Sequence, residues 1–447
     1  MTLDSAHWEQ RLRELATRYD VPGATLGILL GDEVAEAAHG VTNLNTGVEV
    51  TTDTLFQLGS ISKVWTATLV LQLVDEGKLD LDKPLIEYIP ELRLADPDVA
   101  QRLTMRHLLT HTSGIDGDIF DDTGRGDDSL AKYVALLATA RQNHPLEATW
   151  SYCNSGYSLA GRVIEKLTGG TWDAAVREKL VRPLNLTHTV TLPEEALMWR
   201  AAVGHTYEKG ANTVAPVWGI PRSAGPAGAI TATVRDLLAF AKMHITGEGP
   251  LSAAGIEQMA TFQVELPDKH TLGDSWGLGW ERMTWDGRQV IGHDGNTIGQ
   301  SAFWRVLPSA GLSVTLLTNG GNNVKLYDDL FREIFAELAG VATPRRLGPP
   351  SPPVEVDIAP YTAVYERASI RMEVLAEDDG PVLAAQVTGP LAELVPDQNV
   401  RYPLAGVEPG LFVAHDEETD NWIPVTFYQL PTGERYLHFG ARATPRA

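Results

Sequence analysis

Residues 60–77 read SISKVWTATLVLQLVDEG, and they decide the fold around them. Almost every position from Val64 to Val74 is apolar, which predicts a helix buried on all sides, and Gly77 supplies its C-cap. Ser60 and Lys63, three residues apart at its start, project to the same side, so the amine can reach the hydroxyl. A lysine whose pKa is lowered by burial can take the proton of a serine, otherwise a poor nucleophile. The stretch therefore predicts an activated serine at the start of a central helix.

The composition is that of a globular protein and excludes several classes of function. Of 447 residues, 43% are hydrophobic and 21% charged, which excludes collagen, coiled coils and disordered chains. The formal net charge of −22 repels phosphates and anionic lipids, so we expect neither nucleic acid nor a membrane as partner. Residues 1–20 lack the apolar core of a signal peptide, and the single cysteine, Cys153, permits no intrachain disulfide. We expect a cytoplasmic protein that acts on small molecules, and the sequence leaves its oligomeric state open.

Apolar patterning predicts strands near both ends of the first 343 residues and helices between them. The expected strands are residues 24–30, 34–38, 277–285, 289–292, 300–307 and 312–318. The expected helices are residues 1–20, 60–77, 105–109, 129–139, 155–167, 172–179, 233–243 and 327–338. This order predicts an α+β fold in which distant segments complete one antiparallel sheet and helices pack on it.

A proline-rich stretch separates this region from a second one. Residues 344–360 contain six prolines, which exclude helix and central strand and predict a linker. Residues 361–447 show alternating segments and turn signals, so we expect a small all-β domain there. The predicted organisation is a domain at 1–343, a linker at 344–360 and a domain at 361–447.

Two further short motifs carry candidate chemistry. Tyr152 and Asn154 are two residues apart in an extended segment, so their side chains face the same side. A phenol beside a lysine can transfer protons, and an amide can orient the lysine or a substrate carbonyl. Taken alone, the pair is better explained as a half-buried tyrosine and an N-cap asparagine. His293-Asp294-Gly295 follows a predicted strand, where the glycine permits close approach and the N–H of Asn296 can join that of Ser60 in an oxyanion hole. Alone, this triplet also fits a hairpin turn with a surface histidine.

Together, Ser60-x-x-Lys63, Tyr152-x-Asn154 and His293-x-Gly295 resemble the motifs of the serine β-lactamase and penicillin-binding-protein superfamily. The sequence LLTHTSG at 108–114 belongs to the same resemblance, which covers about residues 10 to 340. It is closest to the class C β-lactamase-like branch of esterases and peptidases. It implies a β-lactamase/transpeptidase-like fold, in which an antiparallel sheet flanked by helices joins an all-α lobe and the site lies between them.

The resemblance also implies roles for these residues. Ser60 is the nucleophile that becomes acylated, Lys63 is its base, and Tyr152 is the acid and base for the leaving group and the incoming nucleophile. Asn154 orients Lys63 or a substrate carbonyl, and His293 lines the third wall of the site with Asp294 and Gly295 as substrate-binding neighbours. The amides of Ser60 and Asn296 hold the oxyanion.

The third wall departs from the pattern of penicillin-binding enzymes. They usually carry Lys-Thr-Gly there, a cation that grips a substrate carboxylate, whereas this chain has the neutral His293 and the acidic Asp294. The departure speaks against efficient β-lactam hydrolysis. It favours a serine hydrolase that cleaves a small ester, or a D-stereospecific peptidase or amidase.

A C-terminal β-domain in this branch can resemble a lipocalin-like barrel, which leaves a second function open. In thioesterases that release and cyclise nonribosomal peptides, a basic residue holds the carboxylate at the end of the substrate, and Arg442 or Arg446 is a candidate for it. A non-catalytic binding or sensor protein on the same fold is the alternative from another class. No nucleotide motif is present, and His107 and His111 lack a third metal ligand, so we expect no cofactor and no metal.

Overall fold

The structure is a computed structural model that describes residues 3–208, 210–389, 392 and 398–447. Its largest sheet is antiparallel, with nine strands in the order β3-β2-β1-β14-β13-β12-β11-β10-β9. In that order the strands are Val48–Glu49, Glu33–Asn43, Gly23–Leu30, Leu312–Thr318, Ser301–Leu307, Arg288–Asn296, Glu281–Trp285, Ser275–Trp276 and Val264–Glu265. Ala24 of β1 lies opposite Thr318 of β14, so the predicted completion of one sheet by distant segments is confirmed.

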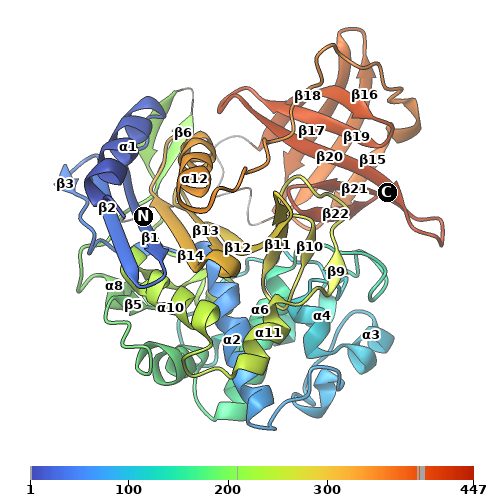
Figure 1. Ribbon diagram of the computed structural model, residues 1–447. Coiled ribbons are helices and arrows are strands. Elements are labelled where there is room, and N and C mark those ends of the chain that lie inside the picture. Colours follow the sequence, from blue (N-terminus) through green and yellow to red (C-terminus); the bar gives the residue numbers. More distant parts are fainter. Residues whose placement is uncertain (1–2, 209, 390–391, 393–397) are drawn as a thin grey trace.

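Helices cover both faces of this sheet (Figure 1). Helices α1 (Ser5–Arg18) and α12 (Asn323–Ala339) lie on one face, and α2 (Ser62–Asp75) and α10 (Val234–Thr246) lie on the other. Because helices cover both faces of the sheet, every residue of the central strands β13 and β14 is buried.

The helical lobe surrounds α2, whose residues from Ser62 to Leu73 are all buried, as its apolar pattern predicts. The helix itself begins two residues later than predicted, because Ser60 lies in a preceding 3-10 turn, η1 (Gly59–Ile61). The other helices are α3 (Pro97–Arg102), α4 (Met105–Leu109), α5 (Ser129–Leu136), α6 (Asn154–Thr168), α7 (Trp172–Val176), α8 (Pro193–Ala196), α9 (Gly225–Gly228) and α11 (Ala253–Ala260). The short strands β4 (Phe56–Gln57), β8 (Thr231–Ala232) and β5 (Thr189–Val190) form a three-stranded sheet, and β6 (His205–Glu208) and β7 (Ala211–Val214) form a separate hairpin.

The C-terminal region forms an eight-stranded antiparallel sheet that nearly closes into a barrel, with the strands in sequence order from β15 to β22 (Figure 1). They are Val364–Arg367, Ile370–Glu377, Gly380–Val387, Asn399–Glu408, Leu411–Asp416, Asn421–Gln429, Arg435–Phe439 and Arg442–Pro445. The first and last strands meet where Tyr365 bridges Arg446, and a core of its own, including Val374, Leu383 and Phe412, fills the interior. The predicted all-β character is confirmed.

Across the residues that the structure describes, no helix combines the length and the apolar character that crossing a membrane requires.

His244 on α10 is buried in the helical layer with no hydrogen-bond partner for either ring nitrogen among the described residues. Its ring packs edge-on against Phe240 and Trp280, with centroids 5.0 and 5.2 Å away. Burial lowers the pKa of His244 from its ordinary 6.5 to about 3. Between pH 6.5 and 3, His244 is therefore protonated in the unfolded chain and neutral in the folded chain. As the pH falls through this range, proton binding to the unfolded chain lowers the free energy of unfolding.

We predict that His244→Leu makes the protein more resistant to acid, because leucine fills the apolar site without a group to protonate. The midpoint of acid unfolding, followed by circular dichroism, should move down by about half a pH unit, while stability near neutral pH changes little. An unchanged or higher midpoint would contradict the assignment of His244 as an acid-labile group.

Candidate active site

Two glycines bring the turn that carries Ser60 against strand β12. Gly59 has a φ of +52°, and a Cβ on it would lie 2.6 Å from the backbone nitrogen of Asn296. A Cβ on Gly295 would lie 1.9 Å from the carbonyl oxygen of Leu58 and 3.0 Å from the backbone nitrogen of Ser60. Only glycine allows this backbone-to-backbone approach. It places the amides of Ser60 and Asn296 side by side, the geometry that an oxyanion hole needs.

Lys63 is the second residue of the buried helix α2, and its side chain is fully enclosed. Its Nζ is 3.0 Å from Ser60 Oγ and donates to the carbonyl oxygen of Ala227 at 2.7 Å. No carboxylate forms an ion pair with it within the described part of the chain. Burial lowers the pKa of Lys63 well below its usual range, and the positive charge of Arg442 lowers it further. A neutral amine beside Ser60 can accept the hydroxyl proton.

Tyr152 lies in the segment before α6 and faces the same two residues. The centre of its ring is 4.7 Å from Lys63 Nζ and 4.9 Å from the guanidinium carbon of Arg442, and His111 stacks on it at 4.3 Å. Burial raises the pKa of Tyr152 far above its ordinary 10. Tyr152 is therefore a protonated phenol that can donate to a leaving group.

Asn154, the first residue of α6, also lines the pocket, so the prediction that it orients a substrate carbonyl stays open, whereas no hydrogen bond joins it to Lys63 among the described residues. Its Nδ2 donates to Asp118 Oδ1 at 3.1 Å, and the group that holds Lys63 is the carbonyl of Ala227. Asn154 thus belongs to a network with Asp118 instead of orienting Lys63. Cys153 points away from the pocket and caps α6, with its Sγ accepting the N–H of Gly156 at 3.2 Å.

His293 lies inside strand β12, which runs on to Asn296 and does not end at Gly292 as predicted. His293 and Asp294 both line the pocket. The Oδ1 atom of Asp294 accepts a hydrogen bond from Arg305 Nη1 at 2.6 Å, and a substrate contact of Asp294 stays a prediction. Burial lowers the pKa of His293 to about 3, and the charge of Lys63 contributes.

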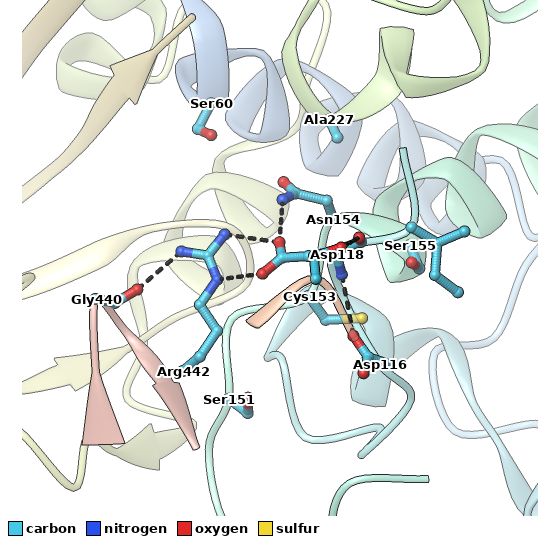
Figure 2. A network of polar contacts seen from close by, with 12 residues as sticks. Ser60, Asp116, Asp118, Ser151, Cys153, Asn154, Ser155, Ala227, Gly440 and Arg442 are labelled. Atoms are coloured by element: carbon cyan, nitrogen blue, oxygen red, sulfur yellow. Dashed lines mark hydrogen bonds and ion pairs between the residues drawn. The ribbon is translucent and has the colours of Figure 1, made fainter. Parts of the chain in front are cut away.

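The C-terminal domain supplies one wall of the pocket through Arg442 (Figure 2). Arg442 donates from Nε and Nη2 to both oxygens of Asp118, at 3.0 and 2.9 Å, and Arg367 binds the same carboxylate at 2.6 Å. Burial alone would raise the pKa of Asp118, but the two guanidinium groups outweigh it and lower this pKa far below the usual range.

Arg446, the other predicted arginine, lies outside the pocket. It is exposed just beyond the end of β22, where its backbone N–H bonds the carbonyl of Arg435 at 2.9 Å. Of the two predicted arginines, the structure thus brings Arg442 and not Arg446 to the pocket, and a substrate-binding role of Arg442 stays a prediction. Asp118 was not predicted as a site residue. Its only signal in the sequence is that two acids, Asp116 and Asp118, flank Gly117 in an otherwise apolar stretch.

The catalytic groups surround a pocket of about 360 Å³ lined by Ser60, Tyr152, Asn154, His293 and Arg442. It continues into a groove of about 690 Å³, with which it shares Phe120, Ile220, Gly228 and Asn296. The groove has an apolar part that includes Leu192, Val217, Trp218 and Pro221, and charged residues, among them Arg125, Glu194 and Arg222, also line it. In the described part of the chain, no cluster of His, Cys, Asp and Glu side chains has the arrangement of a metal site.

Comparison with known proteins places this geometry among enzymes of one kind. The family model described as Beta-lactamase matches residues 8–339. Penicillin-binding protein 4 of Amycolatopsis lactamdurans is 45% identical over 376 residues, 82% of this chain and 99% of that protein. The crystal structure of SurE with D-Leu superposes with a TM-score of 0.78 at 27% identity over 99% of both chains. A D-stereospecific amidohydrolase from Streptomyces sp. superposes with a TM-score of 0.61 at 28% identity, covering 76% of this chain and all of that one.

We predict that Gly295→Ala inactivates the site without unfolding the protein. The added methyl meets backbone atoms of Leu58 and Ser60, which cannot move aside as a side chain can, so the two oxyanion amides are pushed apart. Turnover of an ester substrate should fall by about a hundredfold, the loss seen when an oxyanion donor is removed. Gly170→Ala is the matched control, since its Cβ would meet nothing closer than 3.8 Å. Equal activity of both variants would exclude this oxyanion hole.

Proposed function

Because the chain belongs to the β-lactamase family of serine hydrolases, we propose that it cleaves a small ester or a peptide-like amide through an acyl-enzyme on Ser60. The observation that carries the proposal is the buried Lys63 amine, 3.0 Å from Ser60 Oγ and without a carboxylate partner in the described residues. Such an amine is a base at neutral pH, which an exposed lysine is not.

Acylation follows from the positions of four groups. Lys63 takes the Ser60 proton as Oγ attacks the substrate carbonyl carbon, and the N–H groups of Ser60 and Asn296 stabilise the negative charge on the oxygen. Tyr152 then gives its phenol proton to the leaving group, and Lys63 returns a proton to Tyr152. In deacylation a water or an amine attacks the ester of Ser60, and the same protons move in the opposite direction.

The shape of the site favours a substrate with a large apolar acyl part and a small leaving group. The groove of about 690 Å³ extends from the oxyanion side of Ser60, whereas Arg442 and Ala441 close the other side. Esters and D-stereospecific peptides or amides are the two substrate classes that fit, and the likeness to a D-stereospecific amidohydrolase supports the second.

A second candidate is a thioesterase-like peptide cyclase, in which an amine of the substrate itself releases the acyl group. The observation that favours it is Arg442. Three of its five N–H groups bind Asp118 and the carbonyl of Gly440, which leaves two for a ligand carboxylate beside Tyr152. The similar structure of SurE was determined with D-Leu, an amino acid with a free carboxylate, and this supports a carboxylate-binding site. A protein that only binds its ligand is the alternative of another class, and the complete set of Ser60, Lys63 and Tyr152 speaks against it.

The first test compares wild type with Ser60→Ala on p-nitrophenyl butyrate. We expect the wild type to release p-nitrophenol and to gain the mass of one butyryl group in the mass spectrum of the quenched reaction. Ser60→Ala should lose at least about a thousandfold in rate and should not gain this mass. A Ser60→Ala protein as active as the wild type would remove Ser60 as nucleophile, and a wild type without any adduct would favour the binding protein.

The role of Arg442 is tested with D-leucine and D-leucinamide as competing acceptors of the butyryl group. If Arg442 holds a carboxylate, the wild type transfers the acyl group to D-leucine in preference to the amide. Arg442→Gln should lower this preference by about tenfold or more, the value of one charged hydrogen-bonded pair. Arg446→Gln is the control and should behave as the wild type. An Arg442→Gln variant that keeps the preference would exclude the cyclase-type carboxylate site.

A further inference from the structure

A buried carboxylate that this mechanism does not use lies in the wall of the pocket. Glu281 begins strand β11, lines the pocket beside His293 and has a side chain with no exposed surface. Its Oε1 accepts the backbone N–H of Asp294 at 3.0 Å, and Arg305 Nη1 lies 3.5 Å from its Oε2. Burying an acid in an active-site wall is costly unless it is bound, so its contacts are informative.

The neighbouring His293 has a defined tautomer. Its Nδ1 is 2.6 Å from the carbonyl oxygen of Asp294, and a carbonyl oxygen only accepts, so Nδ1 carries the hydrogen. Nε2 therefore has a lone pair. This atom is buried, has no hydrogen-bond partner among the described residues and belongs to a ring 6.2 Å from that of Tyr152. The pocket thus contains a hydrogen-bond acceptor close to the proton donor.

Glu281 holds the backbone that fixes the tautomer of His293, on the Nδ1 side of the ring. Its Oε1 is 3.6 Å from His293 Nδ1 and is bonded to Asp294 N, the residue whose carbonyl holds the Nδ1 hydrogen. Arg305 holds the carboxylates of both Asp294 and Glu281. The tautomer of His293 is therefore set by one hydrogen-bonded unit on three adjacent strands, β11, β12 and β13.

We propose that Glu281 is a positioning residue that acts through His293, whose Nε2 accepts a hydrogen bond from the N–H of an amide substrate at the reacting nitrogen. The inference rests on the proposed acyl-enzyme. As the C–N bond breaks and the Ser60 Oγ–C bond forms, the nitrogen receives one proton from Tyr152 and keeps the hydrogen it had. His293 holds the retained hydrogen, which orients the nitrogen lone pair toward Tyr152. The reverse step, attack of an amine on the acyl-enzyme, uses the same contact.

This contact separates amides from esters. The oxygen of an ester leaving group has no hydrogen for His293 to hold, whereas the nitrogen of a secondary amide has one. Loss of the Glu281 carboxylate should therefore harm amide cleavage more than ester cleavage, while a general disturbance of the site would harm both equally.

The pH dependence of the amide-to-ester ratio gives an independent readout. Burial and the charge of Asp294 raise the pKa of Glu281 to about 8, and Arg305 opposes them. The other titratable groups facing this unit are Lys63, Tyr152 and His111 on the pocket side and Tyr327 behind Arg305. Lys63 and Tyr152 serve both substrates, so their titration cancels in the ratio. Ionisation of Glu281 makes His293 a stronger acceptor, and the ratio should rise as the pH passes about 8.

The experiment compares N-acetyl-D-phenylalanine methyl ester with its N-methylamide, a pair that differs only at the leaving atom. The ratio of kcat/KM for amide and ester is measured between about pH 6.5 and 9.5 for wild type, Glu281→Gln and Glu165→Gln. Glu165 is the matched control, a buried acid on α6 bound to Arg162 at 3.0 Å and remote from the pocket lining. At the alkaline end of this range, Glu281→Gln should lower the amide-to-ester ratio of kcat/KM about tenfold and flatten its pH dependence. A tenfold loss corresponds to one hydrogen bond, here the bond between the substrate N–H and His293 Nε2.

A Glu281→Gln ratio equal to that of the wild type, or a proportional loss on both substrates, overturns the proposal. If this variant does not fold, Glu281→Asp, which withdraws the carboxylate from Nδ1, takes its place with the same expectation. If the wild type cleaves neither compound, the ¹⁵N NMR signals of the His293 ring decide. Loss of the Nδ1–H tautomer in the variant supports the proposal, and an unchanged tautomer overturns it. Failure of the acyl-enzyme itself shows separately, as absence of the butyryl adduct on Ser60.

Discussion

The burial of the Lys63 amine is the constraint on which the rest of the site depends. An amine in water is protonated at neutral pH and cannot serve as a base, so the fold must keep water and carboxylates away from it. The apolar surface of α2 and the surrounding helices exclude water, and the Ala227 carbonyl gives the amine a neutral partner. The negative charge of Asp118 raises the pKa of Lys63. Arg367 and Arg442 form ion pairs with Asp118, which reduces this effect.

The C-terminal domain is built into this arrangement. The backbone N–H of Tyr152 donates to the carbonyl of Ala441 at 3.0 Å, and that of Ala443 donates to Ser151 Oγ at 3.1 Å. The segment that carries the candidate acid therefore lies along the last strands of the near-barrel and is held by them. Arg442 comes from the same place and turns toward Asp118 (Figure 2). Because backbone groups of Tyr152 and the charge of Asp118 are both satisfied across the interface, the two domains form one site.

The parts of the molecule with strong local signals could be predicted from the sequence. The apolar runs of α2 and β1 are long enough to be recognised in the sequence, and both are buried in the structure. The motif spacing singled out Ser60, Lys63 and Tyr152, which the structure brings together. Other features depend on contacts between distant segments. The sequence around His293 looks like a turn, yet pairing with β13 makes it strand. The four residues of β22 are too few to show a period, so the choice between Arg442 and Arg446 could not be made. A single acid such as Asp118 has no local signature at all.

The neutral His293 and the cationic Arg442 together decide which charges the pocket offers to a substrate. Burial keeps His293 neutral, and Asp294 is neutralised by Arg305, so strand β12 offers no charge to a substrate carboxylate. The cation that lines the pocket is Arg442, which reaches it from the C-terminal domain on the far side of Tyr152. A substrate that carries a carboxylate must then direct it toward Tyr152 and not toward β12. Tyr152 would then donate its proton beside the leaving group or receive one beside the attacking nucleophile. Arg442 can select that part of the substrate by binding a carboxylate on it.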